Sequence, residues 1–357
     1  MTESTPSGWS TLTPKEDPVS WDKYVMRHPK GSVFHASWMV LAYSETPHCK
    51  PFSLAIRNAQ GEIIAMLSAV RISILAGIAG SFTSRSILYG EPLCEPTAEG
   101  EQALAQLINE HDRLMRGSAL FAEVRPISVP GHECARLQLA GYVFNEYLNY
   151  VVDVSRDAET LWIALSKSTR QKIQRSFKRG VEVMQGSTHA DIDRMYSLVK
   201  ESYQRSQVAL VDVGLFHAAL DFFPKEVVQI RLATYEGKDV AAGIGLMFRG
   251  RFYAWYGGSL RIPGISPFDC LTWEEIRFSS ERGLRYYDFG GAGWPGEEYG
   301  PRDFKAKFKG DLVCYGRYQR VYAPLRLKAA EKGYRLIRSL LFGRRASSAQ
   351  GLTRNVS

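Results

Sequence analysis

The chain has no close pairs of cysteines among its 357 residues. Its five cysteines are Cys49, Cys94, Cys134, Cys270 and Cys314. Because no two of them stand at CxxC spacing, zinc and redox sites of that type are excluded, and we expect no metal site. An odd number of scattered cysteines is typical of buried thiols in a reducing compartment. Nothing in their spacing favours a catalytic cysteine.

Long apolar runs are missing too. A membrane-spanning helix needs roughly 18–20 apolar residues, and the nearest candidate, Ile72 to Phe82, is interrupted by glycines and serines. The first residues, Met1 to Pro18, are polar and contain no apolar core of a signal peptide. We therefore expect a cytoplasmic protein that is not integral to a membrane, with residues 1–18 disordered.

The net charge is +8, but most of the chain has no surplus of positive charge. Residues 311–357 hold ten Lys or Arg and two Asp or Glu, and the remainder holds 35 of each sign. A protein that binds nucleic acid over its whole surface would show a wider excess. We expect residues 324–357 to form a basic amphipathic helix and tail. Such a helix could contact the inner face of an anionic membrane, cap the fold or contact tRNA phosphates, and the sequence leaves these three roles open.

The spacing of apolar residues predicts the same order of elements twice. The first half is expected to contain helices at 36–44, 99–116 and 131–139 and strands at 52–58, 62–72, 119–124 and 142–154. The second is expected to contain helices at 191–205, 213–223 and 266–282 and strands at 227–235, 240–248, 252–259, 286–289 and 312–321. This repeat predicts an α+β (α/β) fold of two similar domains, 19–155 and 156–323, each a mixed, mostly antiparallel sheet flanked by helices.

A basic segment between the two halves is the first candidate site. Residues 167–179 contain six basic residues and no acidic one. At 100° per residue, one side of a helix would carry Lys167, Arg170, Arg175 and Lys178, while Ile173 and Phe177 would anchor the other. Arg and Lys on one side suit an anion with several phosphates. A solvated helix face would look similar, and the two interpretations stay open.

Two further elements follow in the second half. The strand at 286–289 runs into a glycine-rich loop with Gly290 and Gly291, whose backbone N–H groups could approach an oxyanion or phosphate. No GK[ST] follows, so the loop is not a Walker motif. In residues 300–310, Phe304 and Phe308 stand four apart and should pack inward, with Lys305 beside them.

Taken together, these elements resemble the Fem family of aminoacyltransferases, which belongs to the GNAT superfamily. The resemblance is carried by Lys167-x-x-Arg170, Lys178-Arg-Gly-Val181, Asp288-Phe-Gly-Gly291, and Gly300 with Phe304-Lys305 before Lys309-Gly310. It extends from about Trp21 to Val321 and is firm from Leu161 to Gly310.

The resemblance implies two tandem GNAT-like domains, with the active site mainly in the second. It implies formation of an amide bond, by transfer of an aminoacyl or acyl group to an amine on a peptidoglycan or polysaccharide precursor. By family analogy, Lys305 stabilises the anionic transition state and Arg170 contacts the phosphates of the acceptor. Asp288 is the carboxylate nearest the expected site and the second expected catalytic residue, although an aspartate at a strand end before glycine is as often structural. The expected substrate-binding residues are Lys167, Arg170, Arg175, Gly290, Gly291, Phe304 and Tyr256.

The sequence also departs from the family. Family members that use nucleotide-linked acceptors have an extra lysine, which is missing here from residues 38–45. The RxxGxG/A signature that binds acetyl-CoA in other GNAT enzymes is also absent, and residues 242–245 match it poorly. The donor, aminoacyl-tRNA or acyl-CoA, therefore stays open, and no tightly bound cofactor is expected. Two alternatives remain, an acyl-CoA-dependent N-acyltransferase of small molecules and a non-catalytic scaffold at the membrane surface.

Overall fold

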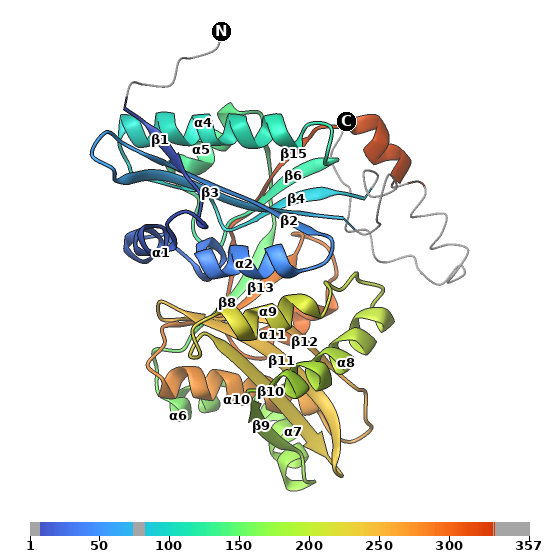
Figure 1. Cartoon of the computed structure of the whole chain (residues 1–357). Coiled ribbons are helices and arrows are strands. Elements are labelled where there is room, and N and C mark those ends of the chain that lie inside the picture. Colours follow the sequence, from blue (N-terminus) through green and yellow to red (C-terminus); the bar gives the residue numbers. More distant parts are fainter. Residues whose placement is uncertain (1–7, 74–82, 331, 333–357) are drawn as a thin grey trace. The chain divides into compact units, whose positions relative to one another are not determined.

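The computed structural model describes residues 8–73, 83–330 and 332, and they form two compact units (Figure 1). Unit 1 comprises Met1–Tyr24, His48–Asn145 and Gly316–Ser357, and unit 2 comprises Val25–Pro47 and Glu146–Tyr315. Neither unit is one continuous stretch of sequence. The N-terminal segment Val25–Pro47, inside the range predicted for the first domain, belongs to unit 2, and the last strand belongs to unit 1.

Unit 1 is built on one mixed sheet. Its strands, in spatial order, are β1 (Ser10–Leu12), β2 (Cys49–Arg57), β3 (Ile63–Ile72), β4 (Arg85–Tyr89), β6 (Phe121–Arg125), β15 (Arg317–Val321) and β7 (Val143–Asn145), with β5 (Leu93–Cys94) paired to β3. Only β4 and β6 pair in parallel. Its described helices include α4 (Ala98–Met115) and α5 (His132–Leu139). The helical spacing of Leu104, Leu107, Ile108 and Leu114 predicts one buried face of α4; the first three are fully buried, but Leu114 is 41% exposed.

Strand β1 corrects the expectation that residues 1–18 are disordered. Ser10–Leu12 pairs antiparallel with β2, and Leu12 is buried. Helix α1 (Pro18–Arg27) begins at the end of that range. Residues 1–7 lie outside the described residues, as does most of the predicted basic tail. The described part of that tail is helical at 324–330 and 332.

Unit 2 is built on a second mixed sheet. Its strands, in spatial order, are β14 (Asp311–Cys314), β8 (Leu148–Asp153), β13 (Tyr286–Gly293), β12 (Arg251–Ser259), β11 (Lys238–Phe248), β10 (Val228–Tyr235) and β9 (Glu182–Gly186). Its helices are η1 (Val33–His35), α2 (Ser37–Glu45), α6 (Ala158–Ala164), α7 (Lys167–Lys178), α8 (His189–Arg205), α9 (Gly214–Phe222), α10 (Pro267–Glu281) and α11 (Gly300–Ala306). Again one pair is parallel, β12 with β13, and the helix between these strands is α10.

Close helix packing on this second sheet depends on glycines. A Cβ on Gly258 would lie 2.8 Å from the Val199 Cα of α8, and one on Gly257 would lie 2.8 Å from the Phe268 ring of α10. Because neighbouring residues of a strand point to opposite faces, α8 and α10 cover opposite faces of the sheet. Between them, Phe252 and Tyr287 stack with ring centroids 5.1 Å apart in the core.

Two strands predicted as single elements are each split between the sheets. The expected strand 142–154 forms β7 in unit 1 and β8 in unit 2, and the expected strand 312–321 forms β14 in unit 2 and β15 in unit 1. The second break is at Gly316, whose φ of +72° only glycine adopts readily. The polar pair Asn145-Glu146 and the pair Gly316-Arg317 interrupt the apolar pattern at the breaks, but a bulge within one continuous strand would give the same local pattern.

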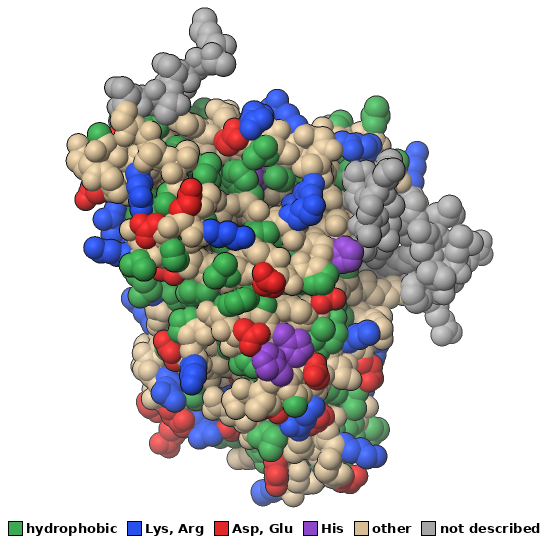
Figure 2. Space-filling model, viewed as in Figure 1, with side chains coloured by type: hydrophobic (Ala, Val, Ile, Leu, Met, Phe, Trp, Pro, Cys, Tyr) green, Lys and Arg blue, Asp and Glu red, His purple; other side chains and the backbone are tan. Residues whose placement is uncertain are grey.

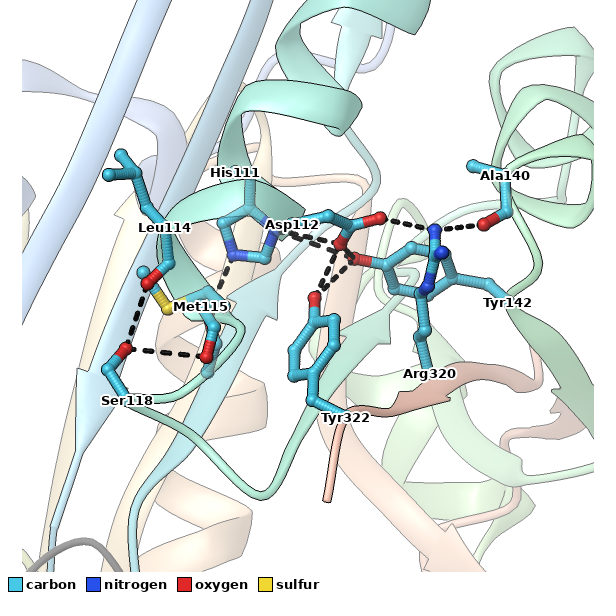
Figure 3. Close-up of polar contacts among 10 residues, drawn as sticks. His111, Asp112, Leu114, Met115, Ser118, Ala140, Tyr142, Arg320 and Tyr322 are labelled. Carbon is cyan, nitrogen blue, oxygen red and sulfur yellow. Dashed lines mark hydrogen bonds and ion pairs between the residues drawn. The ribbon is translucent and has the colours of Figure 1, made fainter. Parts of the chain in front are cut away.

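A buried polar cluster ties β15 to α4 and the end of α5 (Figure 3). The Tyr142 hydroxyl donates to Asp112 Oδ1 at 2.8 Å, and the Tyr322 hydroxyl donates to the same oxygen. Arg320 Nη1 donates to Asp112 Oδ2 and to the Ala140 carbonyl. Burial acts to raise the pKa of Asp112, but His111 and these hydrogen-bond partners together outweigh it and lower that pKa. The cluster therefore anchors the C-terminal strand within unit 1.

Candidate active site

The candidate site begins where two parallel strands of unit 2 separate. β12 and β13 pair only from Arg251↔Tyr286 to Tyr253↔Asp288, although both strands continue beyond. On β12 the register against β11 shifts by one residue at Trp255, and on β13 the register against β8 shifts twice after Asp288. Such bulges bend a strand and interrupt its ladder. Backbone groups at the end of β13 are thereby released from β12.

Lys305 of α11 points at this end of β13. Its Nζ donates to the carbonyls of Phe289 at 2.8 Å and Gly291 at 2.6 Å. An ammonium has three N–H donors, so one donor remains for another acceptor. Burial lowers the pKa of Lys305 to about 8, against the opposing effect of the nearby Asp288 charge. The side chain is thus a fixed cation, mostly charged at neutral pH, beside a strand end rich in glycine.

Phe304 fixes the direction of this lysine, as the sequence predicted. Its ring lies 5.2 Å from that of Phe268 at the start of α10 and 5.6 Å from that of Phe308, which is buried. The neighbouring Lys307 points elsewhere, with its Nζ 2.8 Å from Asp269 Oδ1. Lys305 of α11 and Lys307, directly after this helix, therefore have different partners.

Asp288 is buried, and both of its carboxylate oxygens accept hydrogen bonds. Oδ2 accepts from Arg251 Nη1 at 2.8 Å, and Oδ1 accepts from the Gly290 backbone N–H at 2.8 Å. Gly290 has a φ of +69°, and a Cβ on Gly291 would lie 2.8 Å from the Tyr147 ring. The aspartate thus shapes the glycine turn that follows it, and its salt bridge with Arg251 was not foreseen from the sequence.

A cavity of about 390 Å³ lies beside α11, at the end of β12 and the start of α10. It is lined by Ser259, Leu260, Arg261, Ile262, Pro263, Ile265, Ser266, Pro267, Phe268 and Asp269. Phe268 and Asp269 also contact α11, so the cavity adjoins the element that carries Lys305.

The loop around this cavity contains a signal that sequence inspection missed. Arg261-x-x-Gly264-x-Ser266 differs from the RxxGxG/A signature only in its last residue, and it stands directly before a helix. Gly264 has a φ of +84°, and its carbonyl accepts from Arg179 Nη1 at 2.8 Å. The match could have been found at 261–266, whereas the segment 242–245 lies within β11.

The basic helix α7 packs beneath this loop. Ser176 Oγ accepts from the Ser266 backbone N–H at 2.8 Å, and Ile173 is fully buried. Lys167, Arg175 and Lys178 are exposed. Arg170 differs from the prediction of a free phosphate ligand, because its Nη1 donates to the carbonyls of Ile163 at 2.5 Å and Leu165 at 3.0 Å, at the end of α6. The guanidinium therefore links α6 to α7.

Tyr256, the remaining predicted binding residue, belongs to an aromatic group on β12 and its covering helices. Its ring lies 5.4 Å from Trp255, 5.0 Å from Phe216 of α9 and 6.1 Å from Tyr203 of α8. Both Trp255 and Tyr256 are half-buried. Because β12 bulges at Trp255, two consecutive aromatic residues stand next to the place where β12 leaves β13.

A serine, a histidine and an aspartate also meet in unit 1, but they do not form a second active site. The Ser86 Oγ and His111 Nε2 are 2.8 Å apart, and both residues have no exposed surface. His111 Nδ1 lies 3.6 Å from Asp112, too far for a hydrogen bond, and the carboxylate is occupied by the polar cluster described above. A substrate has no access to this serine.

Within the described ranges, no helix is long and apolar enough to cross a membrane, and no three or more His, Cys, Asp or Glu side chains gather to hold a metal ion.

Comparison with known proteins agrees with this geometry. The family model described as "Acetyltransferase (GNAT) domain" matches residues 165–306, which include α7, the cavity loop, the end of β13 and Lys305. A UDP-N-acetylmuramoylpentapeptide-lysine N(6)-alanyltransferase from Weissella viridescens is 23% identical over 261 residues, which cover 68% of this chain and 75% of that protein.

Two solved structures share the fold. The crystal structure of FemX has a TM-score of 0.66 at 14% identity, over 92% of this chain and 99% of that one. A tandem GNAT protein from the clavulanic acid biosynthesis pathway has a TM-score of 0.57 at 9% identity, over 88% of this chain and 98% of that one. The expectation of two tandem units of this fold is confirmed.

Proposed function

We propose that this chain, a Fem-like acyltransferase of the GNAT superfamily, transfers an aminoacyl or acyl group to an amine on a peptidoglycan precursor. The observation that carries the proposal is the position of the Lys305 ammonium at the separated ends of β12 and β13, with one N–H donor left over. The family match at 165–306 encloses this same group of residues. The alanyltransferase relative supports a precursor of the UDP-N-acetylmuramoylpentapeptide class as acceptor.

The proposed reaction is nucleophilic acyl transfer. The neutral amine of the acceptor attacks the carbonyl carbon of the activated acyl group, and a tetrahedral oxyanion forms. The C–N bond is completed as the bond to the leaving oxygen or sulfur breaks, and the proton lost by the amine balances the one gained by the leaving group. The third N–H of Lys305 donates to the oxyanion, so its charge acts mainly in the transition state.

The other side chains hold this geometry in place. Asp288, which was expected to be catalytic, is proposed as a positioning residue because Arg251 and the Gly290 N–H occupy its carboxylate. Gly290 and Gly291 let the β13 backbone approach the acyl group closely. No general base is assigned, and the amine proton passes to water.

Acceptor binding is proposed on the exposed basic face of α7. Lys167, Arg175 and Lys178 carry no acidic partner on their own helix and suit phosphate oxygens. Arg170 supports this face through its bonds to the end of α6. The half-buried rings of Trp255 and Tyr256 offer an apolar surface for the part of the acceptor near the reacting amine.

One observation favours acyl-CoA as the donor, which is the second candidate function. The Arg261-x-x-Gly264-x-Ser266 loop and its cavity precede α10, where backbone N–H groups of a helix N-terminus favour a pyrophosphate. The alanyl group in the relative's name instead supports an aminoacyl donor, and the resemblance to the Fem family implies aminoacyl-tRNA. Membrane contact through residues 324–357 stays a prediction.

Incubation with a UDP-linked pentapeptide precursor and either alanyl-tRNA or acetyl-CoA separates the two donors. The primary proposal requires a product heavier by one alanyl group with alanyl-tRNA. Transfer from acetyl-CoA alone, lost in Arg261→Ala, would establish the second candidate. No transfer to any amine from either donor, with unit 2 folded, would favour the scaffold interpretation.

A further inference from the structure

Two histidines on the surface of unit 2 meet through their ring nitrogens. His189, at the start of α8, and His217, on α9, have their Nδ1 atoms 2.8 Å apart. The side chains are 54% and 27% exposed, so solvent reaches both rings. Figure 2 shows histidine side chains gathered at the surface with acidic side chains beside them. This pair lies outside the proposed active site, and nothing in the acyl-transfer chemistry uses it.

The outer nitrogen of each ring is held by an aspartate from the other helix. His189 Nε2 lies 3.0 Å from Asp221 of α9, and His217 Nε2 lies 3.0 Å from Asp193 of α8. Each helix thus supplies one histidine and, four residues later, one aspartate. The four side chains form a crosswise arrangement in which each helix orients the ring of the other.

The hydrogen bonds to the aspartates determine whether the two Nδ1 atoms carry a proton. A carboxylate only accepts hydrogen bonds, so both Nε2 atoms must carry the proton that they donate. In the neutral rings both Nδ1 atoms are then bare lone pairs directed at each other. Two facing lone pairs repel unless something positive lies between them, and that can be a single proton or a metal ion.

We propose that His189 and His217 form a binding site for a divalent transition-metal ion of the Zn²⁺ class, which links α8 to α9. Imidazole nitrogen is a preferred ligand of Zn²⁺, Cu²⁺ and Ni²⁺. A histidine ligand almost always donates its other ring N–H to a carboxylate or carbonyl, which sets the tautomer and strengthens the ligand. Asp193 and Asp221 already make both of these contacts.

The metal requires only a small adjustment of the rings. Zn–N bonds are about 2.0–2.1 Å, and at tetrahedral angles the two nitrogens would stand about 3.4 Å apart. The side chains are at the surface and can widen from 2.8 Å by rotation about χ1 and χ2. With two protein ligands in the described structure, water fills the remaining positions, so the site is open.

Binding should be visible in the stability of unit 2. A ligand that binds the folded state alone raises its stability in proportion to ln(1 + [L]/Kd). α9 also carries Phe216, which packs against Trp255 and Tyr256, so a metal that holds α8 to α9 would stiffen the support of this aromatic group.

The test is titration calorimetry of the full-length, chelator-treated protein with ZnCl₂ and NiCl₂. We expect one equivalent to bind, with loss of binding in His189→Ala and in His217→Ala. Asp193→Asn and Asp221→Asn should weaken affinity by about 10–100-fold, the usual effect of removing a carboxylate that orients a ligand. His48→Asn is the matched control, because His48 is exposed, has a φ of +64° that Asn tolerates, and lies outside the pair.

Two results would overturn the proposal. One is the absence of binding heat and of any rise in melting temperature with millimolar metal, which would leave a proton as the shared cation. The other is equal binding by the native protein and by the double variant His189→Ala/His217→Ala. Circular dichroism of each variant, without metal, shows whether α8 and α9 remain folded. If either single variant loses helix, Asp193→Asn and Asp221→Asn carry the test, and native-like affinity in both would refute the site.

Discussion

Replacement of Lys305 tests the chemistry most directly. The Lys305→Ala variant removes the fixed cation at the end of β13, and with it the single N–H donor that the Phe289 and Gly291 carbonyls leave available. Loss of one oxyanion donor typically costs about 2.7–4 kcal/mol, or a factor of roughly 10²–10³ in kcat. Because the contact forms in the transition state, kcat and kcat/KM should fall together with KM little changed.

The dependence of kcat on pH gives a second, independent test of Lys305. With the pKa of Lys305 at about 8, the ratio of charged to neutral amine is about 10 to 1 at pH 7 and about 1 to 10 at pH 9. If only the ammonium assists, the native kcat should fall about tenfold between those pH values through this group. Lys305→Ala should lose this alkaline decline. Lys305→Arg should stay poorly active, because a planar guanidinium does not replace a compact ammonium between two carbonyls.

A structural role must be separated from a catalytic one. Lys305→Ala also leaves two carbonyls without their donor, at about 1–3 kcal/mol for each one that water cannot reach. Thermal melts therefore accompany the steady-state assay, which is run well below the lower melting temperature. Lys307→Ala is the matched control: its partner is Asp269, its side chain is 32% exposed, and it should lose little of either property. Near-normal kcat in Lys305→Ala, or equal damage in Lys307→Ala, would refute the assignment.

Four further substitutions give distinct outcomes. Arg170→Ala should lower the free energy of unfolding in urea by about 1–3 kcal/mol because two carbonyls at the end of α6 lose their donor, whereas Arg175→Ala should raise only the acceptor KM. Equal free energies of unfolding for both variants would contradict the linking role. Gly264→Ala should destabilise the cavity loop by more than about 1 kcal/mol and weaken donor binding. The reason is that φ is +84° and the new Cβ would lie 2.1 Å from Arg179 Nη1. An unchanged melting temperature together with an unchanged KM for the donor would refute this. Burial raises the pKa of Glu275 to about 7, above its unfolded value. The folded state therefore holds an extra proton between about pH 4.5 and 7, and the protein loses stability as the pH rises through that window. The free energy of unfolding of Glu275→Gln, measured in urea, should not show that loss and should exceed that of the native protein at pH 8.

Much of the fold could be predicted because local signals agree with the tertiary structure. The helical spacing of Leu104, Leu107 and Ile108 identified the buried face of α4, and the Phe304–Phe308 pair identified an inward-facing turn. The strand breaks near Asn145 and at Gly316 escaped prediction because a short polar or glycine interruption also fits a bulge within one strand. Which sheet a strand joins depends on partners distant in sequence, and no local pattern contains that information.

The residues predicted for the site differ in what their side chains contact. Lys305 stood out by its family pattern, and the structure places it at the strand end. Arg170 and Asp288 were proposed as ligand or catalytic groups, yet their contacts are with carbonyls, a backbone N–H and Arg251. The sequence contains no signal for these partners, because Asp288 and Arg251 are 37 residues apart and meet only through the pairing of β12 and β13.

The placement of β15 has a consequence for synthesis of the protein. In unit 1 this strand, Arg317–Val321, lies between β6 and β7, although it is translated about 190 residues after β6 and about 170 residues after β7. While the ribosome is still adding unit 2, β6 and β7 lack the strand that joins them, and Asp112 lacks Arg320. The first sheet can therefore close only after nearly the whole chain has emerged. A nascent chain stalled before residue 317 should expose open strand edges and recruit chaperones, and a prematurely ended chain should aggregate rather than yield a free N-terminal domain.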